Sequence, residues 1–338
     1  MSRNKKILIK TDGNNIIGMG HIYRCISIVK ELKKKGFEIN FLIPKNKIIE
    51  EKIQDLGVIH FTNNNQKKEV EIISKIDPDI ILVDLLKKYF PYNEEFWKEI
   101  QKISKLIVTI DFNGKELKYV DLAFNPLFNT KYKARKNFSK IKYCPIRKEF
   151  QEERKKFKIS KKVKSILILQ GGADTKCFIP KIINALKNLP TGIQITVVVG
   201  SAFKCKKEMN KIIIKNHRKI NLLQDIKNMA NVMGKNDIII TSAGVTLIEI
   251  LTIGVPSIIL TGDKHELENA DRIKKEKASI SLGYGKNISQ KMIFETVTEL
   301  VENYKKRKLL SKNSRKVSDG KGIENIVRVI HKEIKNKN

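Results

Sequence analysis

The sequence predicts an α/β protein of two Rossmann-like domains, each a parallel sheet covered by helices. Apolar, strand-like runs alternate with helix-like segments along the whole chain, a pattern typical of parallel sheets. The alternation starts again after residue 164. The chain has 338 residues, more than one domain usually contains, and 41% of them are hydrophobic. Each half can therefore bury a core of its own.

The first domain is predicted to span residues 1–150. Its strands are expected at residues 6–10, 38–43, 79–84 and 106–111. Its helices are expected at residues 21–35, 46–56, 67–76 and 92–104. Residues 151–164 are polar, rich in lysine and without an apolar period, which indicates a linker.

The second domain, residues 165–338, is predicted to repeat this pattern. Its strands are expected within residues 166–172, 195–200, 221–225, 237–244 and 257–263. Helix-like segments follow at residues 178–189 and 246–254. A terminal helix at residues 321–335 is also assigned to this domain. Its apolar residues have helical spacing: Ile323, Ile326, Val327, Val329 and Ile330.

The formal net charge of +32 raises the question of a nucleic-acid partner. Lysines, however, are spread along nearly the whole chain, and aromatic residues make up only 7% of it. No basic motif interleaved with aromatic residues is present, so nucleic acid is disfavoured as a partner. An anionic small-molecule substrate and weak contact with anionic lipid remain compatible with the charge.

The sequence favours a cytoplasmic protein. No apolar run approaches the roughly 18 residues that a membrane span requires, so no stable membrane insertion is expected. The N-terminal residues run directly into a strand and lack the apolar region of a signal peptide. The cysteines lack paired spacing and neighbouring histidines, so neither a metal site nor a disulfide framework is expected, and no cofactor is predicted. They are Cys25, Cys144, Cys177 and Cys205.

Ligands of open α/β sheets bind beyond the carboxyl ends of the strands. Two such sheets that face each other would form a central cleft lined by loops from both domains. The chemistry is therefore expected in the loops that follow predicted strands. These loops lie at residues 12–21, 84–86, 170–174, 200–203 and 242–246.

The segment "GMGHIYRC" contains the candidate catalytic residue. Gly18 and Gly20 allow a tight turn and a close approach of backbone amides to a phosphate or a sugar. Tyr23 occupies the third glycine position of a dinucleotide-binding pattern, which disfavours NAD. His21 falls in the first turn of the predicted helix, where the macrodipole disfavours a charged ring. A neutral ring can accept a proton, so His21 is the predicted general base, with a structural histidine as the alternative.

Two further loops could bind phosphate groups. Gly171 and Gly172 lie between a strand and a helix, so their amides could face an anion, although an ordinary turn has the same pattern. In the second loop, small residues precede a helix that begins at Val245 or Thr246. This helix start is predicted to hold a diphosphate, and Glu249, one turn along, to bind the two hydroxyls of a ribose. The small residues are Ser242, Ala243 and Gly244.

The chain resembles a known family over nearly its whole length. The motifs, in order, are "DGNNIIGMGHIYRCISIVKEL", "YCPIRKEF", "ILQGGADTK", "NMANVMGKNDIIITSAGVTLIEILTIGVPSIIL" and "DGKGIENIV". They resemble the UDP-sugar hydrolases of pseudaminic acid biosynthesis and the spore-coat polysaccharide proteins of SpsG type. These proteins are related to GT-B glycosyltransferases such as MurG.

The resemblance implies a GT-B fold and hydrolysis of a UDP-linked diacetamido trideoxy sugar at its anomeric carbon, without a metal. It implies that His21 activates the water and that Arg147, in the "RKEF" motif, lies near the substrate. It also implies that Glu249 binds the ribose of UDP. The residues that it implies for the diphosphate are Ser242, Ala243, Gly244 and Thr246.

The chain departs from the family pattern at three places. Leu86 stands where the family commonly has tyrosine, and Phe112 where an aspartate is often seen. Lys264 and His265 stand near the place of an Asn–Gln pair. The identity of the sugar is therefore left open. A glycosyltransferase that uses the same donor and a non-catalytic nucleotide-sugar binding protein remain the alternative functions.

Overall fold

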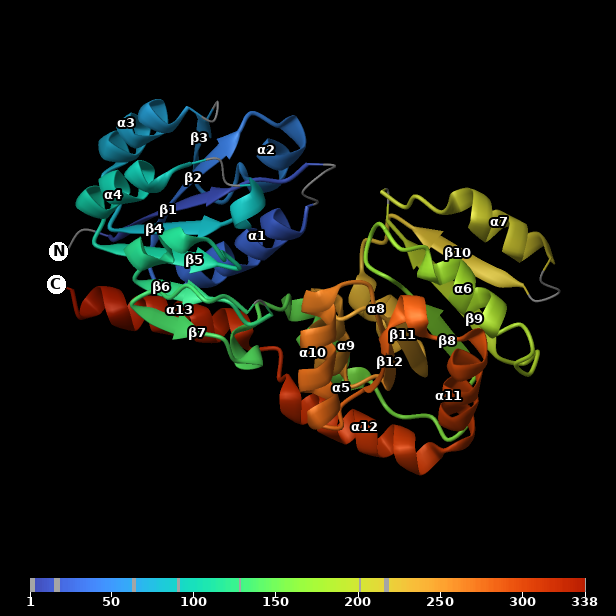
Figure 1. Cartoon of the computed structure of the whole chain (residues 1–338). Helices are drawn as coiled ribbons and strands as arrows, with labels where there is room; N and C mark the ends of the chain where they lie inside the picture. Colours follow the sequence, from blue (N-terminus) through green and yellow to red (C-terminus); the bar gives the residue numbers. More distant parts are fainter. Residues whose placement is uncertain are drawn as a thin grey trace. The chain divides into compact units, whose positions relative to one another are not determined.

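The computed structural model describes residues 4–14, 19–62, 65–89, 92–127, 129–200, 202–215 and 219–337. The chain forms two compact units (Figure 1). The first unit, here the N-terminal domain, contains Met1–Arg147 and Lys321–Asn338, and the second, the C-terminal domain, contains Lys148–Gly320. Each is built on one parallel sheet, so the predicted class of two parallel-sheet α/β domains is confirmed.

The N-terminal domain has a seven-stranded sheet in the order β3-β2-β1-β4-β5-β6-β7, with every described pair parallel. Thr11 pairs with Asp84, and Asp84 pairs with Ile110, so β1, β4 and β5 end side by side. The strands are β1 (Lys6–Thr11), β2 (Glu38–Pro44), β3 (Val58–Thr62), β4 (Ile80–Asp84), β5 (Leu106–Ile110), β6 (Leu122–Phe124) and β7 (Lys136–Phe138).

Helices cover both faces of this sheet because its strand residues alternate between two apolar cores. Ile7 and Ile9 pack with α1 and α2, whereas Leu8 packs with α3 and α4. The helices are α1 (Gly20–Lys33), α2 (Lys47–Ile53), α3 (Gln66–Ile76) and α4 (Glu94–Ile103). Short 3₁₀ helices are η1 (Lys87–Tyr89), η2 (Lys115–Tyr119) and η3 (Ile141–Tyr143).

The C-terminal domain has a six-stranded parallel sheet in the order β10-β9-β8-β11-β12-β13. The strands are β8 (Ser165–Ile168), β9 (Gln194–Val199), β10 (Ile220–Gln224), β11 (Ile238–Thr241), β12 (Ser257–Thr261) and β13 (Ile280–Tyr284). The helices are α5 (Lys148–Lys156), α6 (Phe178–Ala185), α7 (Lys206–Lys215), α8 (Met229–Gly234), α9 (Val245–Ile253), α10 (Lys264–Lys275), α11 (Gln290–Glu302) and α12 (Tyr304–Val317), with η4 at Gly285–Asn287.

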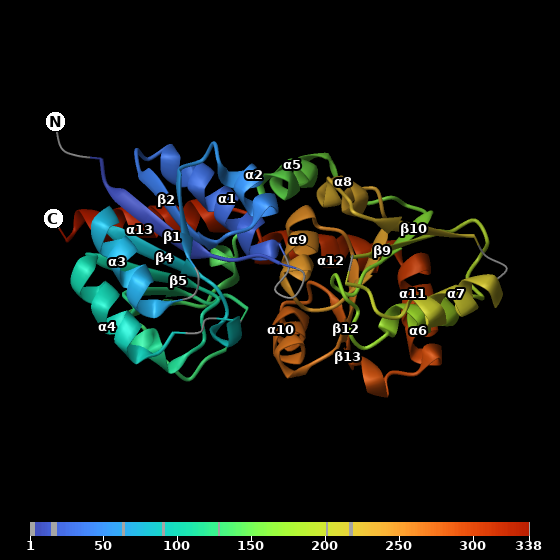
Figure 2. The same cartoon turned by 90° about the horizontal axis from the view of Figure 1, so that it is seen from above.

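The terminal helix α13 (Gly322–Lys335) belongs to the N-terminal domain, which corrects its assignment to residues 165–338. Its buried apolar face joins the core that contains α1. In Figures 1 and 2, α13 is the red helix that lies along this domain. The apolar spacing predicted the helix itself correctly, but such spacing does not specify which core the helix joins.

The predicted linker, residues 151–164, is also wrong in its first part. Residues 151–156 continue α5, which begins at Lys148 and packs in the C-terminal domain. Phe150 and Glu153 are its buried residues. The Arg154 guanidinium donates hydrogen bonds to the carbonyl oxygens of Thr252 and Ser318, at 2.9 and 2.8 Å. In the sequence, a charged segment whose side chains bind backbone groups has the same pattern as a solvent-exposed linker.

None of the helices in the described ranges is both long and apolar enough to cross a membrane.

Candidate active site

His21 lies in the first turn of α1, as predicted, and its ring contacts a buried carboxylate. The Nδ1 atom lies 2.8 Å from Oδ1 of Asp84, the last residue of β4. Burial alone would raise the pKa of Asp84, but the charge of Arg24 and the hydrogen bond to His21 outweigh it and hold this pKa well below its usual range. Asp84 is thus a carboxylate and can only accept a hydrogen bond.

Nδ1 of His21 must therefore carry the ring proton and donate it to Asp84. The Nη2 atom of Arg24 also lies 3.0 Å from Nδ1. That contact is not a hydrogen bond, because Nδ1–H and the guanidinium are both donors. The Nε2 atom is left unprotonated, with its lone pair available to accept a proton. This arrangement of carboxylate and imidazole is the one that general bases use in hydrolytic enzymes.

Arg24 joins two carboxylates at the ends of neighbouring strands. Its Nε atom donates to Oδ2 of Asp84 at 2.7 Å and its Nη2 atom donates to Oδ1 of the same carboxylate. Its Nη1 atom donates to Oδ2 of Asp111, the residue after β5. Cys25 contacts Oδ2 of Asp84 at 3.3 Å, and burial raises the pKa of its thiol, which stays neutral. We call His21, Arg24, Asp84 and Asp111 the dyad cluster.

The sequence analysis did not assign Arg24, Asp84 or Asp111 to the site. A usable signal was present, because two consecutive predicted strands, residues 79–84 and 106–111, each end in aspartate. Parallel strands that are neighbours bring such residues to one edge of the sheet. The partner of His21 could not be read from local pattern, since Asp84 is 63 residues away.

A cavity of about 210 Å³ lies at the carboxyl ends of β1, β2 and β4, and its lining does not include His21, Arg24, Asp84 or Asp111. Thr11 lines it and donates a hydrogen bond from Oγ1 to the Asp84 carbonyl oxygen at 3.3 Å. Lys10 also lines it and is paired with the buried Glu69 at 2.6 Å. The remaining lining residues are Asp12, Pro44, Leu85, Lys88 and Tyr89.

The other predicted residues of the N-terminal domain lie at its loops. Gly20 is the first residue of α1 and is exposed, and Gly18 lies outside the described residues. Arg147 directly precedes α5 and is half-buried.

In the C-terminal domain, α9 begins without a side-chain cap from its N-cap residue. Gly244 occupies the N-cap position and supplies no side-chain cap for the amides of the first turn. Helix α10 holds the preceding loop in place, because Asn269 donates from Nδ2 to the Ala243 carbonyl oxygen at 3.2 Å. Ser242 is nearly buried, and Thr246 is half-buried in the first turn. Uncapped amides at a helix start are suited to bind phosphate oxygens.

Glu249 lies one turn into α9, half-buried between the buried residues Ile248 and Ile250. Glu249 therefore lies at the edge of the buried face of α9. A carboxylate in this place can accept two hydroxyl hydrogen bonds.

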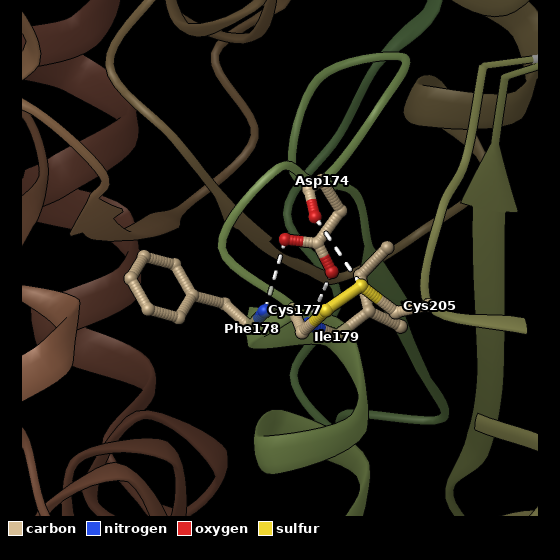
Figure 3. The surroundings of a disulfide bond; sticks show 5 residues. All are labelled: Asp174, Cys177, Phe178, Ile179 and Cys205. Atoms are coloured by element: carbon tan, nitrogen blue, oxygen red, sulfur yellow. Dashed lines mark hydrogen bonds between the residues drawn. A yellow bond between two sulfur atoms is a disulfide. The ribbon is translucent and has the colours of Figure 1, made fainter. Parts of the chain in front are cut away.

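Gly171 and Gly172 lie between β8 and α6, as predicted, and five residues separate Gly172 from the helix. Asp174 accepts hydrogen bonds from the Phe178 and Ile179 amides at 2.9 and 2.8 Å (Figure 3). These first amides of α6 are therefore not available to an anion. Any ligand of this loop would be bound by the loop itself.

Figure 3 also shows a disulfide bond between Cys177 and Cys205, which corrects the expectation of no disulfide. The two Cα atoms are 5.6 Å apart. Because β8 and β9 are parallel neighbours, the loops that follow them emerge at the same edge of the sheet. The Gly200 amide also donates to the Gly172 carbonyl oxygen at 3.0 Å. Spacing along the sequence could not reveal this pairing, since 28 positions separate the cysteines.

Comparison with known proteins places these sites in context. Residues 165–329 match the glycosyltransferase family 28 C-terminal domain. An uncharacterised protein of Methanocaldococcus jannaschii is 32% identical over 80% of this chain, and the chain spans 58% of its length. The spore coat polysaccharide biosynthesis protein SpsG of Bacillus subtilis is 25% identical over 95% of this chain and 96% of SpsG.

A glycosyltransferase of Acetivibrio thermocellus is 27% identical over 60% of this chain and 58% of its own length. Its name is UDP-N-acetylglucosamine–N-acetylmuramyl-(pentapeptide) pyrophosphoryl-undecaprenol N-acetylglucosamine transferase. Among solved structures, MurG of Acinetobacter baumannii is similar in fold, with a TM-score of 0.69 over 97% of this chain and 99% of that one, at 15% identity.

The two parallel-sheet domains and the likeness to MurG define this chain as a protein of the GT-B fold. Its similarity to SpsG extends over nearly the whole length of both proteins. Together the comparisons support a SpsG/PseG-like family of GT-B proteins for this chain.

Proposed function

We propose that the protein is a UDP-sugar hydrolase that releases UDP and a free amino sugar for nonulosonic acid or surface polysaccharide biosynthesis. The His21–Asp84 pair is the observation that carries the proposal. A protein that only binds nucleotide sugars has no use for a histidine whose Nε2 lone pair is held ready by a buried carboxylate. The family relationship supports a UDP-sugar as the substrate class.

In the proposed reaction, the C-terminal domain binds UDP. The amides at the start of α9 hold the diphosphate, and the Glu249 carboxylate accepts hydrogen bonds from the ribose hydroxyls. Ser242, Ala243, Gly244 and Thr246 form that loop, whereas Gly171 and Gly172 contribute backbone groups. A positively charged helix end stabilises the departing diphosphate.

The dyad cluster provides the base. His21 Nε2 accepts a proton from water as the water oxygen bonds to the anomeric carbon. The bond from that carbon to the diphosphate oxygen breaks, and UDP leaves with the oxygen and its electron pair. Asp84 stabilises the imidazolium that forms. Gly18, Gly20 and Arg147 are proposed to contact the sugar or phosphate groups. The reaction needs no cofactor, and we place it in the cytoplasm.

A glycosyltransferase is the second candidate, and the match to glycosyltransferase family 28 favours it. The same base would then deprotonate an acceptor hydroxyl instead of water. The donor site would be unchanged, because both reactions break the same bond.

The test is to incubate the purified protein with a panel of UDP-linked amino sugars, without acceptor and with EDTA, and to follow the products by NMR. We expect UDP and free sugar to appear. His21→Ala should abolish turnover and still bind UDP, whereas Glu249→Ala should weaken UDP binding. Binding of a donor without release of sugar would point to the transferase. Full turnover by His21→Ala would exclude the proposed base.

A further inference from the structure

The charges of the dyad cluster do not cancel while the His21 ring is neutral. Arg24 contributes one positive charge, and Asp84 and Asp111 contribute two negative charges, in a site where Arg24 is 11% exposed and the carboxylates are nearly inaccessible. A proton on His21 makes the sum zero. A buried cluster of this kind favours uptake of one positive charge, because excess charge is costly away from water.

Asp111 is held in a position that serves this charge balance. Its backbone has a φ of +54°, a region that residues other than glycine seldom adopt, and its amide donates to the Phe124 carbonyl oxygen at 2.9 Å. Oδ2 accepts from Arg24, whereas Oδ1 is buried with no hydrogen-bond partner among the described residues. Burial and the charge of Asp84 raise the pKa of Asp111, whereas the ion pair with Arg24 opposes this rise and favours the carboxylate form that the charge balance requires.

The groups around His21 come from four elements. Helix α1 contributes Arg24 and the neutral Cys25, β1 contributes the Thr11 hydroxyl, and β4 contributes Asp84. The turn after β5 contributes Asp111. If Arg24 were paired with Asp84 alone, the two charges would cancel, and the pair would give little electrostatic stabilisation to a protonated His21 ring.

We propose that Asp111 is a positioning residue that offsets the charge of Arg24, so that the Asp84 carboxylate remains available to stabilise the protonated ring of His21. The role of His21 as base rests on the proposed function, but the electrostatic coupling does not. Asp111 does not need to touch the substrate for this role.

The test compares Asp111→Asn with Asp79→Asn. Asparagine has the shape of aspartate and tolerates the left-handed backbone, so the change removes the charge, and replaces one acceptor oxygen by an amide donor, with little change of shape. Asp79 lies just before β4, at the opposite end of the strand from Asp84, where it accepts the Lys6 amide hydrogen bond at 3.0 Å. The ring signals of ¹⁵N-labelled histidine are followed against pH, and the His21 signal is assigned by its loss in His21→Ala.

In Asp111→Asn, the His21 signal should change at a pH lower by at least about half a unit than in the unaltered chain. Asp79→Asn should leave the pH of this change unaltered. In Asp111→Glu, which keeps the charge, the His21 signal should change at nearly the same pH as in the unaltered chain. If Asp111→Asn does not fold, Arg24→Gln should move the signal in the opposite direction. An unmoved His21 signal in folded Asp111→Asn, or an equal shift in Asp79→Asn, would overturn the proposal.

Enzyme assays give a second readout that depends on the proposed function. The acid limb of kcat/KM against pH should move with the NMR signal, while UDP binding stays unchanged. If no UDP-sugar is turned over, the NMR titration still decides the coupling, so failure of the hydrolase proposal and failure of this one can be told apart.

Discussion

At the scale of single residues, Asp84 orients the site of the N-terminal domain. It binds the ring of His21, the Nε and Nη2 atoms of Arg24 and the thiol of Cys25. We expect Asp84→Asn to lower kcat on the order of 10³-fold, because an amide at this place can donate to Nδ1 and move the ring proton to Nε2. UDP binding should be unaffected. The measurement is turnover together with the ¹⁵N shifts that report the ring tautomer; an unchanged tautomer would contradict the reasoning.

The same substitution should reduce stability in a pH-dependent way. The pKa of Asp84 is lower in the folded chain than its ordinary value near 4, so its ionised form stabilises the fold. That stabilisation is present above about pH 4 and is lost as the pH falls through the lower folded pKa. Asp84→Asn should therefore cost about 3 kcal/mol at neutral pH and less below pH 4. Denaturant unfolding at pH 7 and pH 3 measures the difference.

At the scale of elements, the disulfide ties the loop after β8 to the loop after β9. Closing 28 positions in the unfolded chain corresponds to about 3 kcal/mol. Reductant should lower the denaturant midpoint of unfolding of the unaltered protein. The Cys177→Ser/Cys205→Ser variant should unfold at this lower midpoint without reductant, and adding reductant should not change it. Cys144→Ala, which alters a buried cysteine outside the disulfide, is the matched control and should still respond. If four thiols reacted with a thiol reagent in protein that had been unfolded without reductant, the disulfide would be contradicted.

The sequence predicted some elements better than others, for physical reasons. Strands β1, β4 and β12 are fully or nearly fully buried and appear as continuous apolar runs. Strand β3 was missed because it lies at the sheet edge and only one of its residues is buried. Strands β6 and β7 were missed because each has three residues, too few to show an alternating pattern. His21, Glu249 and the loop at Ser242 could be found because each stands next to a recognisable helix start. Arg24 could not, since its role depends on strands brought together by folding, whereas Asp111 was indicated only by its place at the end of a predicted strand.

At the scale of the whole molecule, the chain ends in the domain where it begins. Helix α13 buries Ile323, Ile326 and Ile330 in the core that also contains Ile22 and Val29 of α1. An amphipathic pattern shows that a helix has a face to bury, but it does not name the partner surface. The N-terminal domain is therefore completed only after the C-terminal domain has been synthesised, which the order of motifs along the sequence does not reveal.

This assignment of α13 can be measured because the chain has a single tryptophan. Trp97 is fully buried in the N-terminal domain, so its fluorescence reports the unfolding of that domain. Ile330→Ala leaves a cavity in the core and should destabilise the tryptophan-reported transition by about 2–5 kcal/mol. UDP binding by the C-terminal domain should persist at denaturant concentrations at which the tryptophan signal shows that the N-terminal domain has begun to unfold. Lys332→Ala, on the exposed side of α13, should leave the transition within about 0.5 kcal/mol. If Ile330→Ala weakened UDP binding and spared the tryptophan signal, α13 would belong to the C-terminal domain instead.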